Sequence, residues 1–98
     1  MNKYVVIYPY SDAPPSEERM QAWMAWFETI RESVVDGGNP FGGGAAETTN
    51  DGAVALTDQP GRAGGYSIFN AASIDDAIAL LADCPITSGV RVYEALAM

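Results

Sequence analysis

Hydrophobic and polar positions alternate along the chain in a way that predicts several short strands. Residues 3–8 are rich in β-branched and aromatic side chains, which is typical of a central strand with apolar groups on both faces. Asn50-Asp51-Gly52 is a turn signal between two strand-like segments and predicts a hairpin. The strands are expected at residues 3–8, 45–49, 53–56, 66–70 and 89–94.

Apolar residues at steps of three and four predict an amphipathic helix after the first strand. They are Met20, Trp23, Met24, Phe27, Ile30 and Val34. Ser16 is the expected N-cap, and the helix is expected to end near Asp36-Gly37, because glycine is a common helix terminator. A second helix is expected to begin at Ser73, where an acid follows three residues later, and to end at Cys84-Pro85.

The order of these elements predicts one domain, residues 1–98, with an α+β fold of the ferredoxin-like βαββαβ type. Such a fold has an antiparallel sheet with two helices on one face. The strands at 3–8 and 66–70 carry apolar residues on both sides, so the second face of the sheet also needs a cover. We therefore expect a homodimer in which two sheets pack face to face.

Charge and residue usage exclude several function classes. Thirteen acids stand against five scattered bases, which gives a net charge of −8 and argues against binding to nucleic acid or to an anionic membrane. The chain has no His, which excludes His-based metal sites, Ser-His-Asp triads and imidazole proton shuttles. We expect neither a metal nor a cofactor.

Cysteine usage and hydropathy bear on location. The single Cys84 cannot form an internal disulfide, and its position at the predicted end of a helix favours a structural role. No apolar run approaches the roughly 18–20 residues of a membrane span, and no secretory signal peptide is expected. A cytoplasmic protein is the prediction.

The glycine-rich stretch VVDGGNPFGGG, residues 34–44, is the first candidate site. Asp36 and Asn39 could bind a small polar ligand together with backbone N–H groups, or the stretch could be a helix terminator followed by a turn. It matches neither G-x-G-x-x-G after a strand nor G-K-[ST], so a nucleotide-phosphate loop is not expected.

Aromatic residues and one arginine are further candidates. Trp23 and Phe27 lie on the predicted core stripe, whereas Trp26 lies at its flank and is a candidate for a pocket wall or a subunit contact. Arg62, in a Gly/Pro loop, could attract a carboxylate or phosphate, or could be a solvated charge.

Three tyrosines are expected on neighbouring strands: Tyr8, Tyr66 and Tyr93. Their phenols could line a cavity and bind a ligand, or could pack in the dimer interface.

Taken together, several stretches resemble the YCII-related family of small dimeric α+β barrel proteins. They are KYVVIY, MQAWMAWFETI, DGGNPFG, GGYSIFNAASIDDAIALLADCPI and VRVYEALAM. In some members of that family, a His near the end of the first helix and an Asp in the following loop are thought to form an acid/base pair. Local alignment places Phe27 at the position of the His, and Asp36 is the candidate counterpart of the Asp.

The resemblance leaves three functions open. The leading expectation is a homodimeric YCII-like protein that binds a small polar or anionic molecule or is otherwise non-catalytic. The second is a cofactor-independent isomerase, lyase or hydrolase with Asp36 as general base and Arg62 or Tyr66 as its electrostatic partner. The third is an interaction module without a ligand.

Overall fold

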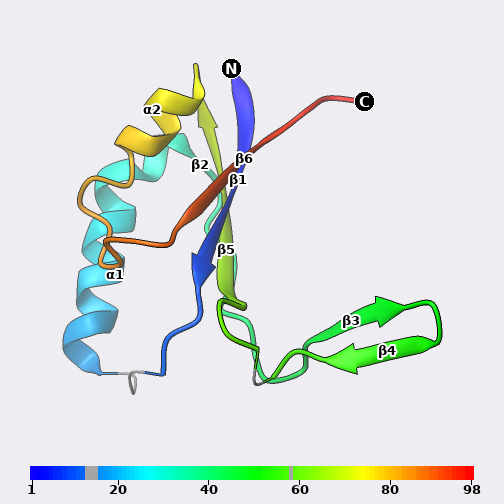
Figure 1. Cartoon of the computed structure of the whole chain (residues 1–98). Helices are drawn as coiled ribbons and strands as arrows, with labels where there is room; N and C mark the ends of the chain where they lie inside the picture. The colour runs from blue at the N-terminus through cyan, green and yellow to red at the C-terminus, as the bar shows by residue number, and fades with distance from the viewer. Residues whose placement is uncertain (13–15, 58) are drawn as a thin grey trace.

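The computed structural model describes residues 1–12, 16–57 and 59–98, and its main body is a four-stranded antiparallel sheet (Figure 1). The strand order is β2-β5-β1-β6, and every pairing in this sheet is antiparallel. These strands are β1 (Asn2–Pro9), β2 (Val34–Asp36), β5 (Ala63–Ala71) and β6 (Arg91–Ala95). A separate two-stranded hairpin consists of β3 (Ala46–Thr49) and β4 (Gly52–Ala55).

The helices α1 (Glu17–Ile30) and α2 (Ile74–Ala79) lie on the same side of the sheet (Figure 1). Both begin as the sequence predicts, because the Ser16 hydroxyl accepts from the Arg19 N–H and the Ser73 hydroxyl accepts from the Asp76 N–H. The α+β class with a mostly antiparallel sheet and two helices is confirmed, and the strand order is compatible with a ferredoxin-like class.

The prediction that the first helix continues to Val34 is wrong. The helix ends at Ile30, the 3₁₀ turn η1 (Arg31–Ser33) follows, and β2 begins directly afterwards. Val34 and Val35 are β-branched and prefer an extended backbone, and Val34 lies opposite Phe69 of β5. Residues 34–36 therefore add a strand to the main sheet, and the predicted hairpin at 45–56 forms outside it.

The face that α1 buries also differs from the predicted stripe. Trp26 is only 3% exposed, whereas Met20 and Met24 are 62% and 67% exposed. The buried side of the helix runs through Trp26 and Ile30. It is rotated about the helix axis by roughly 100°, the turn of one residue, from the side with Met20 and Met24. The interpretation of Trp26 as a flanking residue is thus corrected: Trp26 is the centre of the helix contact.

The core lies between the helices and one face of β1 and β5. On β1, Tyr4, Val6 and Tyr8 point to this face and are buried, while the alternating residues point to the other. On β5, Phe69 is fully buried and joins Trp26 in the larger of two hydrophobic clusters. The sheet thus packs on α1 through the larger cluster, and the smaller cluster holds Ala77 of α2.

The opposite face of the sheet has no helix over it (Figure 1). Val5 of β1 lies opposite Ile68 of β5 and Tyr93 of β6, and Tyr93 is 52% exposed. The molecule is correspondingly flat, with principal extents of 42 × 40 × 19 Å. Among the residues that the structure describes, neither α1 nor α2 has the length and apolar character needed to cross a membrane.

Candidate functional site

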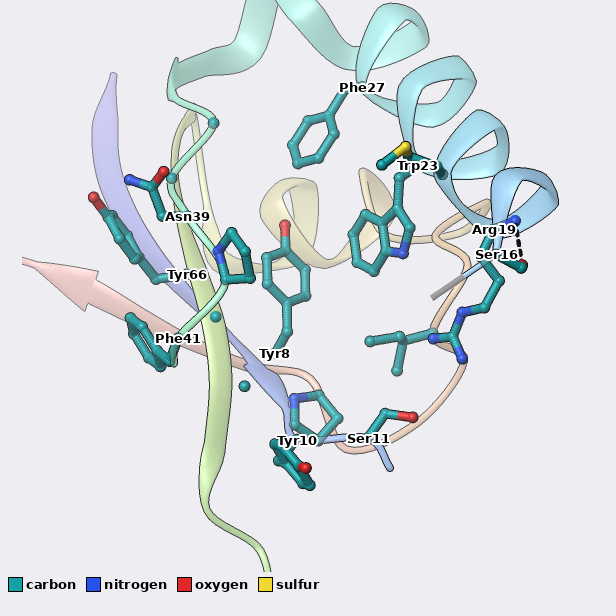
Figure 2. A pocket seen from close by; sticks show the side chains of 18 residues that line it. Tyr8, Tyr10, Ser11, Ser16, Arg19, Trp23, Phe27, Asn39, Phe41 and Tyr66 are labelled. Atoms are coloured by element: carbon teal, nitrogen blue, oxygen red, sulfur yellow. Dashed lines mark hydrogen bonds between the residues drawn. The ribbon is translucent and has the colours of Figure 1, made fainter. Parts of the chain in front are cut away.

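A cavity of about 530 Å³ opens between α1, the end of β1 and the loop that follows β2 (Figure 2). We call it the aromatic pocket. Tyr8, Trp23 and Phe27 form its inner wall, and Pro40 and Phe41 border it on the side of the loop. Its volume is in the range of protein sites for single small molecules.

Periodicity explains why three aromatic rings meet at the inner wall. Trp23 and Phe27 are four residues apart on α1 and therefore lie on the same side of the helix. Their rings stack at 5.9 Å, and Tyr8 meets Trp23 edge to face at 5.1 Å. Figure 2 shows the Tyr8 ring rising from β1 beside the Trp23 ring, with the Phe27 ring above them.

The loop wall is attached to β5 by backbone hydrogen bonds. The Phe41 N–H donates to the Gly64 carbonyl at 2.9 Å, and the Tyr66 N–H donates to the Asn39 carbonyl at 3.3 Å. Gly38 has φ +75°, and a Cβ there would overlap the Tyr66 carbonyl oxygen. Only glycine allows both this backbone angle and this close approach, so the sequence at Gly38 fixes the loop's position.

Below the aromatic wall, two hydroxyl groups form a buried chain. The Tyr8 hydroxyl donates to the Ser67 Oγ at 2.9 Å, and the Ser67 hydroxyl donates to the Gly37 carbonyl at 2.7 Å. Burial raises the pKa of Tyr8 to about 12, although the hydrogen bond to Ser67 opposes the shift. Tyr8 is therefore a neutral phenol at physiological pH, and its oxygen can still accept a hydrogen bond.

Arg19 is the one ionised side chain among the described residues that line the pocket. It is half-buried, and Figure 2 shows its side chain extending from α1 along the pocket toward Ser11. The Ser16 hydroxyl, which also borders the pocket, accepts from the Arg19 backbone N–H and keeps its own proton to donate. The polar groups at this edge are thus mainly donors.

Of the residues singled out in the glycine-rich stretch, Asn39 lines the pocket and Asp36 does not. The Asp36 carboxylate accepts from the Gly38 N–H at 2.8 Å and from the Tyr66 hydroxyl at 3.4 Å. Asp36 is exposed and lies opposite Ile68 on the helix-free face. Its local role is to hold the turn that contains Gly38.

The three candidate tyrosines are divided between the two faces of the sheet. Tyr8 points into the pocket, whereas Tyr66 and Tyr93 are in register with Ile7 and Val5 on the helix-free face. Tyr66 borders the pocket, but its ring stacks on Phe41 at 5.8 Å.

The remaining candidates lie outside the pocket. The Trp26 indole N–H donates to the Leu80 carbonyl at 3.0 Å, within the core. The Arg62 guanidinium stacks on the Tyr10 ring, 3.6 Å from its centre. Cys84 is buried, as a structural role requires, and burial raises the pKa of its thiol.

Sequence reasoning missed the pocket roles of Trp23, Phe27, Arg19 and Ser16. Trp23 and Phe27 were expected in the core, and they pack against it from its edge while lining the pocket. Arg19 follows an N-cap and two acids, a pattern typical of any solvated helix start. The available signal was the spacing of Arg19, Trp23 and Phe27 at steps of four, which places them on one helix face.

No group of three or more acidic or Cys side chains that could hold a metal ion occurs among residues 1–12, 16–57 and 59–98. Comparison with family models, with curated proteins and with solved structures gave no match.

Proposed function

We propose that this chain is a small-molecule-binding protein and that the aromatic pocket is its binding site. The observation that carries the proposal is a cavity of about 530 Å³. Tyr8, Trp23 and Phe27 line this cavity, and no side chain of the described residues fills it. Apolar concave sites with a few polar groups at the edge are where proteins commonly bind small ligands. A purely structural role would favour side chains that close this space.

A screen of apolar fragments by ligand-observed NMR tests the binding function. We expect hits whose affinity falls by about 10-fold or more in Trp23→Ala, because the variant removes a large part of the apolar wall. Trp23→Phe keeps an aromatic wall and should retain measurable binding. Met24→Ala is the matched control, since Met24 lies on the same helix and is exposed.

The absence of any hit with the folded wild-type protein would contradict the binding function and leave the interaction-module alternative. Hits that bind Trp23→Ala unchanged would also contradict it, because they would lie elsewhere on the surface.

We further propose that the protein is a homodimeric, ferredoxin-like α+β barrel protein of the YCII-related kind. The stretches that resemble that family support the assignment, as does the strand order β2-β5-β1-β6. The exposed area also supports it: the chain exposes 7029 Å², whereas a compact monomer of 10.4 kDa exposes roughly 5,400 Å². The excess of roughly 1,600 Å² is larger than the ~800 Å² that each partner buries in a standard interface.

Light scattering at micromolar concentration tests the dimer. We expect twice the chain mass for the wild type, and a shift toward monomer for Tyr93→Lys, which adds a charge to the helix-free face. Met24→Lys is the control, because Met24 is 67% exposed on the opposite side of the molecule. A wild-type monomer under these conditions would refute the dimer and leave the pocket proposal intact.

The enzymatic alternative rests on one observation, the 3.4 Å contact between the Tyr66 hydroxyl and the Asp36 carboxylate. In that reading Asp36 is a general base on the helix-free face and Tyr66 orients it. Asp36→Asn should then abolish turnover of a discovered substrate, and unchanged turnover would remove Asp36 as the base.

A further inference from the structure

The charge at the aromatic pocket is opposite to the charge of the chain. The protein has thirteen acids and five bases. The described residues that line the pocket nevertheless include one base, Arg19, and no acid. Glu17 and Glu18 precede Arg19 but are exposed and do not line the cavity. Among the described lining residues, a cationic ligand therefore finds no counter-ion, whereas an anionic ligand finds Arg19.

The guanidinium of Arg19 has donors to offer. Within the described part of the chain, the ion pair that forms is Arg31 with Glu28, at the far end of α1. Arg19 forms no ion pair with another described residue, and it is half-buried. A guanidinium in such a place gains most from a planar partner with two oxygens, because its N–H groups match a carboxylate in pairs.

The rest of the pocket selects an apolar body for the ligand. The rings of Tyr8, Trp23 and Phe27 already contact one another, edge to face and in a stack, and line the pocket together. A flat ring of a ligand placed against this cluster would add further aromatic contacts. The Tyr8 hydroxyl donates to Ser67, so it offers a ligand an acceptor and not a donor.

A single positive charge favours a monoanion over a phosphate ester. A phosphate close to −2 in charge would bring more charge than Arg19 can balance, in a chain whose net charge is already −8. The second cation nearby, Arg62, is stacked on Tyr10 and does not line the pocket.

We propose that the ligand of the aromatic pocket is an apolar monocarboxylate, with a flat ring against the cluster of Tyr8, Trp23 and Phe27 and its carboxylate on the Arg19 guanidinium. This inference rests on the proposed binding function and adds the ligand class to it.

Calorimetric titration with four matched naphthalene probes tests the ligand class at about 50 mM salt, where surface charges are only partly screened. The probes are 2-naphthoate, the neutral 2-naphthamide, the cationic 2-naphthylmethylamine and 2-naphthyl phosphate. We expect naphthoate to bind about 10-fold more tightly than naphthamide, as a charge-assisted contact would provide. Naphthylmethylamine and naphthyl phosphate should be weaker than naphthoate.

Substitutions of two arginines distinguish a direct contact between Arg19 and the ligand from a general effect of the protein's net charge. Arg19→Gln should remove most of the preference for naphthoate over naphthamide, and Arg19→Lys should retain part of it. Arg31→Gln makes the same change in net charge at an exposed position directly after α1. This control should keep the full preference for naphthoate. Circular dichroism of each variant verifies that it is folded.

Several results would overturn the ligand class while leaving the binding function in place. They are equal binding of naphthoate and naphthamide, a preference for the amine or the phosphate, a preference that persists in folded Arg19→Gln, and failure of all four probes when other fragments bind at Trp23. Failure of every probe and every fragment would refute both proposals.

Discussion

At the scale of single residues, the most constrained positions lie beneath the aromatic pocket. Ser67 is fully buried, and its hydroxyl both accepts from Tyr8 and donates to the Gly37 carbonyl. Both hydroxyl groups and the Gly37 carbonyl therefore have a hydrogen-bond partner, which offsets the cost of removing them from water. The hydroxyl pair also joins β1, β5 and the loop after β2, and Tyr8 and Gly37 of this set line the pocket.

The phenol of Tyr8 should make stability depend on alkaline pH. The pKa of Tyr8 is about 12 in the folded protein and 10.0 in the unfolded chain, so the unfolded chain loses its proton first. The contribution to stability is complete below pH 10 and is lost as the pH rises toward 12. We expect a loss of up to about 2–3 kcal/mol from this residue.

Urea unfolding of the wild type and of Tyr8→Phe, below pH 10 and near pH 12, measures the effect. The decline in the free energy of unfolding should be smaller in Tyr8→Phe, because its ring cannot ionise. Equal declines in the two proteins would show that Tyr8 is not the group responsible.

Gly38 and Gly37 form a matched pair for testing the loop wall. Gly38→Ala should destabilise the protein by more than about 2 kcal/mol, because φ is +75° and the new Cβ would overlap the Tyr66 carbonyl. Gly37→Ala should cost less than about 1 kcal/mol, since a Cβ there meets nothing within 4 Å. Thermal unfolding compares them, and equal midpoints would contradict the described loop geometry.

At the scale of elements, the position of α1 on the sheet is fixed by Trp26. Its indole ring contacts Phe69 of β5 and Phe27 of its own helix, and its N–H donates to the Leu80 carbonyl. This single side chain therefore joins the helix to the sheet and to the end of α2. The rotation that buries Trp26 also turns Trp23 and Phe27 toward the pocket.

Truncation of Trp26 should thus be severe, and truncation of Met24 should not. We expect Trp26→Ala to lower the free energy of unfolding by about 3–5 kcal/mol, from lost burial and the cavity that remains. Met24→Ala should change it by less than about 0.5 kcal/mol, because Met24 is 67% exposed. Chemical denaturation distinguishes them, and comparable losses would mean that α1 buries the stripe with Met24 instead.

At the scale of the whole molecule, the chain is flatter and more extended than its length requires. Its radius of gyration is 14.7 Å, compared with about 12.6 Å for a compact domain of this size. The hairpin of β3 and β4 accounts for part of the extension, because it projects from the body on the side away from the helices and all of its residues are exposed (Figure 1).

Removal of the hairpin should leave the body folded. We expect replacement of residues 46–55 by a short Gly/Ser linker to change the free energy of unfolding of a monomeric variant such as Tyr93→Lys by less than about 1 kcal/mol, since no buried residue is lost. Urea unfolding of the shortened and full-length variants measures this. A loss of several kcal/mol would show that the hairpin supports the sheet within one chain.

Signals contained within a few neighbouring residues predicted much of the fold. The N-caps at Ser16 and Ser73, the turn at Asn50-Asp51 and the strand at 3–8 agree with the structure, because each depends on a hydrogen bond or a side-chain alternation that is complete locally. The same signals predicted the α+β class. Local chemistry also supplied Asn39, Tyr8 and Tyr66 as candidates that do line the pocket.

The sequence by itself determined the local elements and the surplus of acidic charge. Only the tertiary structure decided that 34–36 join the main sheet, that Trp26 is buried, and that the helix face with Arg19, Trp23 and Phe27 lines a pocket. These outcomes depend on a rotation of α1 and on the pairing of β2 with β5, which are set by contacts between residues far apart in the chain. Apolar residues at steps of three and four do not define the rotation of a helix about its axis to better than about one residue. Packing of side chains in the core selects one rotation.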